Sequence, residues 1–300
     1  MRIAITGSSG MIGSALISSL IKEGHSLSRV VRTKLSLNNP EYIFWDTERQ
    51  EIDLNKLEGY DAVIHLAGAN IAGKRWSSIY KKILYDSRIK TTTFLCESLV
   101  RLKKIPRVLL SASAVGYYGN HAPHDVIDEH CLAGNDFLAK LCVDWEKACL
   151  PAREAGIRVV NIRFGVVLGT KGGALAKMLP IFKLGLGGPI ASGQQMMSWI
   201  ALEEIPAIVV HLLRHDVING AVNIVSPNPV SNAEFTKILG KILRRPTVFP
   251  VPAWGLKILF GEMAETLLIG GAKVVPKRLL DSGYQFHYPE LSSALGAALR

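Results

Sequence analysis

The sequence lacks the spacings and long apolar runs that are typical of disulfide frameworks, metal sites and membrane spans. No pair of its cysteines has the Cys-x-x-Cys spacing of a zinc or redox motif. The longest uncharged stretch, between Lys183 and Glu203, is broken by glycine, proline and glutamine, and the start offers only a few apolar residues before Gly7. We therefore expect no metal, no membrane partner, no export signal and a reducing, cytoplasmic location. The cysteines, expected as free thiols, are Cys96, Cys131, Cys142 and Cys149.

Acidic residues are fewer than basic ones, which leaves a formal net charge of +10. This excess suits a phosphate-rich partner, either a nucleic acid, a dinucleotide or a nucleotide-linked substrate. The basic clusters, such as Lys241 with Arg244 and Arg245, are short and lack interleaved aromatic residues. We therefore expect a small-molecule substrate of an anionic or nucleotide-linked kind, no nucleic acid, and a monomer or homodimer.

Short β-branched runs alternate with segments of helical apolar spacing through the first half of the chain. This alternation predicts an α/β fold with a doubly wound parallel sheet. After Gly165 the pattern changes to glycine-rich loops and a proline-rich passage, which predicts a smaller C-terminal α/β lobe. We place a dinucleotide-binding Rossmann domain at 1–165 and a substrate lobe at 166–300, with some strands and helices returning to the first domain. The predicted strands are Ile3–Thr6, Arg29–Arg32, Tyr42–Trp45, Ala62–Leu66, Arg107–Ser111 and Arg158–Arg163, and the predicted helical segments are Met11–Lys22, Ser77–Lys103 and Phe137–Ala155.

A glycine-rich loop follows the first predicted strand directly and opens the first predicted helix. Gly7 permits a tight turn, Gly10 removes a Cβ where the backbone must approach a pyrophosphate, and Gly13 lets the helix pack closely on the strand. The pyrophosphate would meet free N–H groups at the positive end of the helix. The residues predicted to bind it are Gly7, Ser9, Gly10, Met11, Ile12 and Gly13.

The end of the second strand distinguishes NADP from NAD. An NAD site has an acidic residue about 20 residues past the glycines, on the ribose 2′-hydroxyl. This chain has Arg32 and Thr33 there, followed by Lys34. An arginine favours a 2′-phosphate, so we predict NADP(H) with Arg32 and Thr33 in its site; the alternative is a surface arginine at a strand end. Asp46 either caps the adenine or starts a turn.

Several motifs give the chain a family resemblance. With the glycine loop, His65–Ala69 and Ser111–Gly119, it resembles an extended short-chain dehydrogenase/reductase, and the last motif is similar to the SSxxxYG stretch of sugar-nucleotide epimerases and dehydratases. Further motifs resemble an atypical epimerase-family subgroup that includes a protein once labelled a cell-division-inhibitor homologue. They are Lys74–Trp76, Ser87–Arg88, Phe137–Leu138, Asp144–Glu146, Arg163–Gly169, Met197–Ile200 and, near the C-terminus, Gly270, Val274–Pro276, Arg278–Leu280, Gly283–Tyr284 and Phe286.

Positions after helical stretches and at strand ends indicate further contacts at the ligand edge of the sheet. Arg88 and Arg163 are placed to face cofactor phosphate or an anionic substrate, although each could instead close a structural ion pair. Gly172–Gly173 and the loop near Gly185 look like covers over a cleft, with Trp199 as a wall; His65 is expected to serve packing. The remaining predicted cofactor-binding residues are Leu66, Ala67, Gly68, Arg88, Ser111 and Val166.

The acid/base pair of the resembled family is missing. That family uses a tyrosine and a lysine four residues later, and the corresponding positions hold Phe137 and Leu141, with Lys140 only approximately on the same side. The remaining candidates for catalysis are Ser113, at the end of a central strand, and Tyr117, in the following loop. The leading hypothesis is an NADP(H)-dependent oxidoreductase or epimerase-like enzyme acting on a small carbonyl or nucleotide-linked sugar. The alternative is a catalytically silent NADPH-binding redox sensor or partner-docking protein.

Overall fold

The computed structural model describes residues 1–32, 39 and 41–300. Its central sheet has the strand order β12-β8-β6-β5-β1-β2-β3-β4, in which only β4 runs antiparallel to its neighbour. The strands that follow β1 are added first on one side of it, as β2, β3 and β4, and then on the other side, beginning with β5. This switch in strand order confirms the predicted doubly wound α/β fold. The strands are β1 (Arg2–Thr6), β2 (Ser26–Val31), β3 (Tyr42–Asp46), β4 (Glu51–Ile52), β5 (Ala62–His65), β6 (Val108–Ala114), β8 (Arg158–Phe164) and β12 (Gly220–Ile224).

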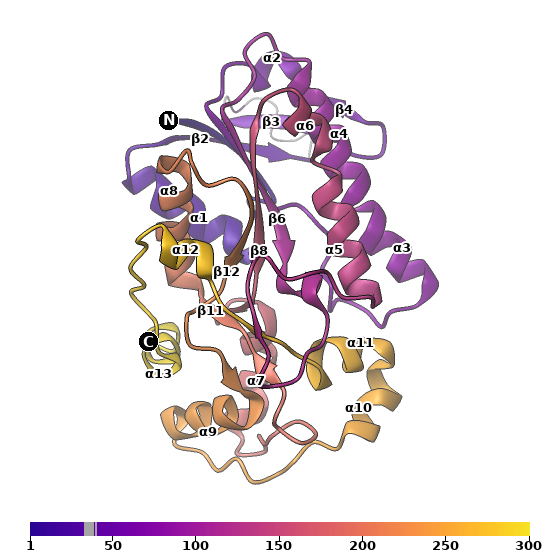
Figure 1. Ribbon diagram of the computed structural model, residues 1–300, viewed down its shortest axis with the longest axis vertical. Helices are drawn as coiled ribbons and strands as arrows, with labels where there is room; N and C mark the ends of the chain where they lie inside the picture. Colours follow the sequence, from indigo (N-terminus) through magenta and orange to yellow (C-terminus); the bar gives the residue numbers. More distant parts are fainter. Residues whose placement is uncertain (33–38, 40) are drawn as a thin grey trace.

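Helices cover both faces of this sheet (Figure 1). On one face α1 and α8 pack on Ile5, Ile64 and Val160, and on the other α4 and α6 pack on Ala4 and Val63. Because both faces are buried, the central strands consist of nearly continuous apolar runs. The bounds are α1 (Met11–Lys22), α2 (Leu54–Leu57), α3 (Ser78–Asp86), α4 (Ile89–Val100), α5 (Phe137–Lys147), α6 (Leu150–Glu154), α8 (Ile205–Arg214) and α12 (Lys277–Asp281).

Two predicted helical segments are each divided in the structure. Ser77–Lys103 forms α3 and α4, because the Ser87 hydroxyl turns back to the Leu84 carbonyl and accepts a bond from the Ala69 amide. Phe137–Ala155 forms α5 and α6, with Pro151 in the first turn of α6. Proline fits the first turn of a helix but not its interior, which explains the second break.

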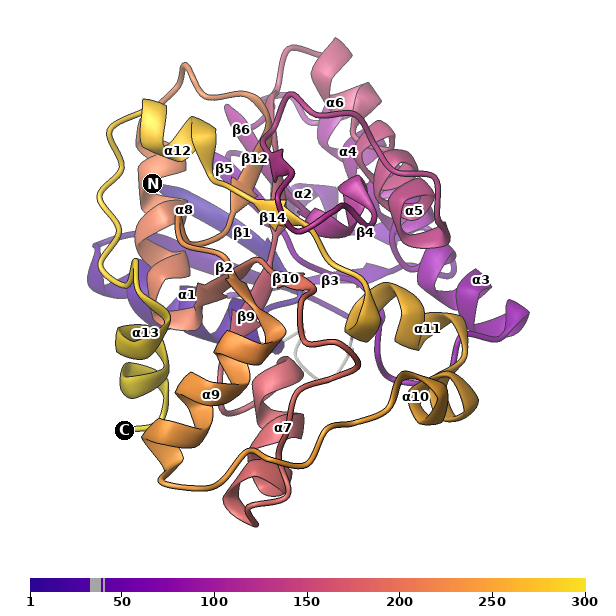
Figure 2. The ribbon, with the colours of Figure 1, turned by 60° about the horizontal axis from the view of Figure 1, so that its bottom comes forward.

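The rest of the chain forms a lobe below the sheet (Figures 1 and 2). Its own core gathers Trp199, Phe235 and Leu295. Residues 205–224 return to the first domain, where α8 packs on α1 and β12 pairs with β8 at the edge of the sheet. Strand β11 does not join this sheet but pairs with β9 in the lobe. The lobe contains β7 (Val126–Ile127), β9 (Val166–Leu168), α7 (Gly173–Lys183), β10 (Met196–Met197), β11 (Trp199–Ala201), β13 (Val230–Ser231), α9 (Asn232–Leu243), α10 (Ala253–Phe260), α11 (Glu262–Ala264), β14 (Lys273–Val274) and α13 (Leu291–Ala298).

Among the described residues there are also three short helical turns, namely η2 (Val115–Tyr118), η3 (Leu202–Glu204) and η4 (Glu265–Ile269). Across the described residues, no helix combines the length and apolar character that crossing a bilayer requires.

Candidate active site

The predicted site residues follow the carboxyl ends of neighbouring parallel strands. Strand β1 ends at Thr6, β5 at His65 and β6 at Ala114, and their pairing aligns Thr6 with His65 and Ser113 with Arg163. Parallel strands bring the loops that follow them to one edge of the sheet, where ligands bind in doubly wound folds. In Figure 1 strand β6 points toward the lobe, so this edge faces it.

The glycine loop is too tight for side chains. Gly7 has φ +68°, and a Cβ on it would lie 2.7 Å from the carbonyl carbon of Leu66. A Cβ on Gly13 would lie 2.4 Å from the Gly7 carbonyl oxygen. Both contacts are with backbone atoms, which no rotamer change can relieve. The loop is therefore held against the first turn of α1 and against the loop after β5.

The N-terminus of α1 is left open to an anion. Its N-cap is Gly10, which provides no side-chain capping bond, and its first turn has no acidic residue. The first N–H groups of a helix need partners from outside the helix and carry the positive end of its dipole. Ser9 and Gly10 are exposed and Met11 and Ile12 are half-buried, so the loop is accessible from the sheet edge. These features fit a bound pyrophosphate.

A glycine-rich loop of the lobe lies on this first turn. A Cβ on Gly169 would come within 2.7 Å of Met11 Sδ, and one on Gly173 within 3.2 Å of Met11 Cε. Gly172 also lies beside the Met11 side chain. The predicted cover at Gly172–Gly173 thus contacts the phosphate loop itself.

Arg32 directly follows β2 and is exposed beside the strand that carries the glycine loop. A 2′-phosphate would be bound at this position. The role of Arg32 in binding it remains a prediction. Thr33, like Lys34, lies outside the described residues. The Asp46 carboxylate accepts hydrogen bonds from the amides of Glu48 and Arg49, so it starts a turn, as one of its two interpretations proposed.

A buried polar network supports the loop after β5. Thr6 Oγ1 accepts bonds from the amides of Leu66 and Ala67 at 3.1 and 3.2 Å and contacts His65 Nδ1 at 2.7 Å. His65 Nε2 lies 2.9 Å from Thr92 Oγ1. Burial lowers the pKa of His65 to about 4, so the ring is neutral at pH 7. It serves packing, as the sequence indicates, and fixes the cofactor-facing loop.

Arg88 is a buried cation under this loop. Its guanidinium donates hydrogen bonds to the carbonyls of Leu84 and Ala69. The guanidinium carbon lies 5.0 Å from the Trp145 ring centroid and 3.5 Å from where a Cβ on Gly68 would be. Burial lowers its pKa, yet arginine stays charged in proteins. Among the described residues no carboxylate pairs with it. A buried charge without a counter-charge is costly, so the site fits an anionic ligand.

Ser113 belongs to a compact charged cluster. Its hydroxyl donates to Glu146 Oε1 at 2.7 Å, and Arg163 binds the same carboxylate through Nε and Nη2 at 2.7 and 2.8 Å. Burial alone would lower the pKa of Arg163, but Glu146 outweighs it and raises the value. Arg163 therefore closes a structural ion pair, which was one of its two predicted roles. A nearly buried carboxylate stands behind the Ser113 hydroxyl.

The two tyrosines of η2 have different surroundings. Tyr118 donates to Asn223 and accepts from Arg163, and burial raises its pKa to about 12. It is therefore a structural residue. The Tyr117 side chain is half-buried, and its ring centroid lies 3.4 Å from the guanidinium carbon of Arg163. Of the two, Tyr117 keeps the freer hydroxyl.

The positions that correspond to the family's tyrosine and lysine offer no acid/base group. Phe137 packs edge-on against Trp76 at the start of α5, and Leu141 is buried. Lys140 is exposed on the same helix. The helix that carries these two positions, α5, also supplies Glu146 of the Ser113 cluster.

Of three further predicted residues, Ser111 and Trp199 are fully buried and Val166 is half-buried. Ser111 is fully buried in β6, and Val166 begins β9 with its amide bonded to Ser198. Their cofactor contacts remain predictions. Trp199 was expected to form a cleft wall, and this is wrong: its side chain is fully buried in the lobe core and its indole N–H donates to the Asn228 carbonyl.

Sequence reasoning assigned no role to Glu146. The available signal was its place in the Asp144–Glu146 motif, four residues after the buried Cys142, which puts it on the buried side of α5. Only the structure shows that it accepts from both Ser113 and Arg163.

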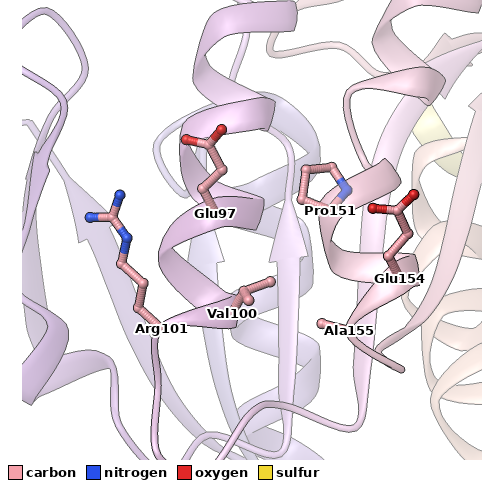
Figure 3. A pocket seen from close by; sticks show the side chains of 6 residues that line it. All are labelled: Glu97, Val100, Arg101, Pro151, Glu154 and Ala155. Carbon is pink, nitrogen blue, oxygen red and sulfur yellow. The ribbon is translucent and has the colours of Figure 1, made fainter.

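Two surface depressions lie elsewhere. One, of about 590 Å³, is a shallow groove between α4 and α6, where Glu97, Arg101 and Glu154 surround Val100 (Figure 3). It lies on the outer side of the helix layer and holds none of the predicted residues. Another, of about 520 Å³, is formed by the loop after Tyr118, around His121 and Cys131.

Comparison with known proteins agrees with this geometry. An epimerase family protein of Mycobacterium bovis is 43% identical over 296 residues, which are 99% of this chain and 97% of that protein. The structure of the human epimerase family protein SDR39U1 (isoform 2) with NADPH is 35% identical, covers 100% of both chains and superposes with a TM-score of 0.91. A nucleoside-diphosphate sugar epimerase from Corynebacterium glutamicum is 33% identical with a TM-score of 0.81, over 100% of this chain and 58% of that one.

Two family models match the sequence. One, described as a domain of unknown function, matches residues 251–298, and the other, described as the NAD dependent epimerase/dehydratase family, matches residues 3–224. The second match covers more than half of the chain and contains the glycine loop, the loop after β5 and the Ser113 cluster. The chain therefore belongs to the NAD dependent epimerase/dehydratase family.

Proposed function

We propose that the protein is an NADP(H)-dependent oxidoreductase or epimerase-like enzyme acting on a small carbonyl or nucleotide-linked sugar. The observation that carries the proposal is the Ser113 hydroxyl, backed by the Glu146 carboxylate at 2.7 Å, at the same sheet edge as the open N-terminus of α1. The NADPH of the human relative and the substrate class of the Corynebacterium epimerase support it.

The chain's own residues fit a dinucleotide phosphate. The α1 amides would hold its pyrophosphate, Arg32 its 2′-phosphate, and the unpaired Arg88 guanidinium would face a further negative group. The bound nicotinamide would supply or accept a hydride. The Gly169–Gly173 loop, in contact with Met11, would cover the phosphates from the lobe side.

In this proposal Ser113 moves the substrate's proton. Its Oγ donates to Glu146 and keeps lone pairs that can accept from a substrate hydroxyl. In the oxidising direction the substrate proton passes to Ser113 Oγ while the serine's own proton passes to Glu146 Oε1. The reducing direction reverses both transfers. Arg163 holds the carboxylate in place by two hydrogen bonds, and Tyr117 lies beside it as a second hydroxyl.

A silent NADPH-binding sensor or partner-docking protein is the second candidate. The observation in its favour is the apolar environment of Phe137 and Leu141, where the resembled family has its acid/base pair. Such a protein would keep the cofactor site and have no turnover.

The experiment combines binding with turnover. Calorimetry should show tighter binding of NADPH than of NADH, and Arg32→Ala should reduce the preference by about 10- to 100-fold, as expected for charge-assisted bonds to a phosphate. A panel of carbonyls and sugar nucleotides is then screened for NADPH oxidation. Turnover that Ser113→Ala and Tyr117→Phe both fully retain would contradict the placement of the proton transfer. Tyr85→Phe, on the exposed side of α3, is the matched control.

Tight NADPH binding without turnover on any panel member would favour the sensor. Absence of heat with either dinucleotide at low salt would reject both candidates.

A further inference from the structure

Part of the lobe combines positive charge with a complete lack of acidic residues. Between Glu234 and Glu262 the chain has five basic residues and no aspartate or glutamate. The segment runs from α9 through a proline-rich connection to α10, along the outer edge of the lobe (Figure 2). The basic residues are Lys237, Lys241, Arg244, Arg245 and Lys257.

Large apolar side chains are exposed in the same segment. Trp254 is 69% exposed, and Ile258 and Leu259 are 66% exposed each. Val248 and Phe249, in the connection before α10, are 70% and 53% exposed. We call these five residues the α10 surface. Single exposed apolar residues are common. Five of them within twelve positions, two of which are aromatic, indicate a surface that binds an apolar partner.

We propose that the α10 surface docks on an anionic lipid bilayer, with its apolar side chains in the interface and the basic residues facing lipid phosphates. Trp254 and Ile258 are four residues apart and so share one side of α10. Lys257 pairs with Glu265 at 2.7 Å, so the cations available to lipid phosphates are those that precede α10 in the segment. Tryptophan and long aliphatic side chains beside lysine and arginine are the composition of helices that lie in a membrane interface. Nearby cations add attraction to acidic headgroups.

The charge distribution favours a bilayer over a second copy of the chain. A symmetric dimer would place the same surface of each copy against the other. Lys257 already pairs with Glu265, which follows the segment, at 2.7 Å, so the segment would bring together two sets of four cations, Lys237, Lys241, Arg244 and Arg245, with no acid within the segment to pair with them. Repulsion between these like charges would weaken a symmetric dimer, whereas an anionic bilayer surface would attract them.

The proposed contact is peripheral. Helix α10 has eight residues and is about 12 Å long, far too short to cross a bilayer. The sequence-based expectation of no membrane partner was drawn from the lack of a spanning segment, and peripheral docking needs only a surface. The proposal does not depend on the cofactor site.

The test uses the full-length protein and sedimentation with vesicles of phosphatidylcholine, with or without about 30% phosphatidylglycerol. We expect binding to the acidic vesicles, reduced at least about tenfold by Trp254→Glu/Ile258→Glu. Arg244→Gln/Arg245→Gln should weaken binding to acidic vesicles and flatten its salt dependence. Ile21→Glu/Val217→Glu, which adds the same charge at exposed apolar positions elsewhere, should bind like the wild type.

Three outcomes would overturn the proposal. The first is no sedimentation with acidic vesicles, and the second is an equal loss in the control variant. The third is a dimer, detected by light scattering, that Trp254→Glu/Ile258→Glu dissociates while vesicle binding is absent. NADPH binding by each variant, measured in parallel, separates a damaged fold from a lost surface.

Discussion

Replacing Gly13 by alanine sets two opposing effects against each other in the first turn of α1. Alanine in a helix is favoured over glycine by about 1 kcal/mol. The new Cβ, however, would lie 2.4 Å from the Gly7 oxygen and 2.9 Å from Ser8 Cα. Ordinary contact begins at 3.4 Å, so the Gly7 carbonyl must move by about 1 Å or the helix must shift by as much.

Both responses disturb the phosphate loop. The Gly7 carbonyl accepts the Gly10 amide at 3.1 Å, and moving it weakens that bond. Overpacking costs about 1–3 kcal/mol and a hydrogen bond about 1 kcal/mol, which together exceed the helical gain. We expect Gly13→Ala to lower the free energy of unfolding by about 1–3 kcal/mol and to weaken NADPH binding at least about tenfold.

Urea denaturation gives the first quantity and calorimetric titration with NADPH the second. The matched control is Gly296→Ala in α13, where a Cβ would meet nothing within 4 Å. This variant should be as stable as the wild type or up to about 1 kcal/mol more stable, with unchanged NADPH binding. If both substitutions behave alike, the close approach at Gly13 does not constrain the loop and the reasoning fails.

Three further predictions concern the buried polar groups. Folding lowers the pKa of His65 from 6.5 to about 4, so the unfolded chain binds the proton more tightly than the folded protein does. The free energy of unfolding should therefore fall by about 3 kcal/mol as the pH drops from 6.5 to 4. Urea titrations of His65→Gln should lack this pH-dependent loss. Glu146→Ala leaves the buried Arg163 unpaired and should cost about 3–5 kcal/mol in the same assay, whereas a loss below 1 kcal/mol would deny the ion pair a structural role. Arg88→Leu removes a buried cation that has no carboxylate partner among the described residues, but it also removes the bonds to the carbonyls of Leu84 and Ala69. These effects oppose each other, so the ligand-free protein should lose at most about 1 kcal/mol of stability while calorimetry shows weaker NADPH binding; a large loss of stability with intact binding would refute this.

The sequence predicted the sheet well because burial on both faces makes its strands near-continuous apolar runs, as in Ala62–His65 and Arg158–Phe164. The glycine loop was predictable for a local reason, since its spacing, strand and helix are contiguous. The division between α3 and α4 was not, because the apolar spacing continues through Ser87. The helix ends there through bonds to Ala69, which is distant in sequence.

The candidate site was predictable only in part, for the same reason. Ser113 follows from its place at a strand end, but its partner Glu146 is 33 residues away and is identified by an interaction, not by a pattern. Trp199 shows the opposite error: its glycine-rich surroundings indicate a cleft, while the fold places it in a core. A single sequence reports which residues are apolar, and it does not report which cavity they fill.

The pairing of β12 with β8 has a consequence for how this chain acquires its structure. Five residues from the second half complete the sheet, and α8 covers apolar side chains that α1 and the strands leave open. A fragment ending at residue 165 would present β8 as a bare edge, available to strands of other molecules, above an uncovered patch. We therefore expect the first half of the chain to complete its fold only after residue 224 has left the ribosome, and a fragment that ends at residue 165 to aggregate.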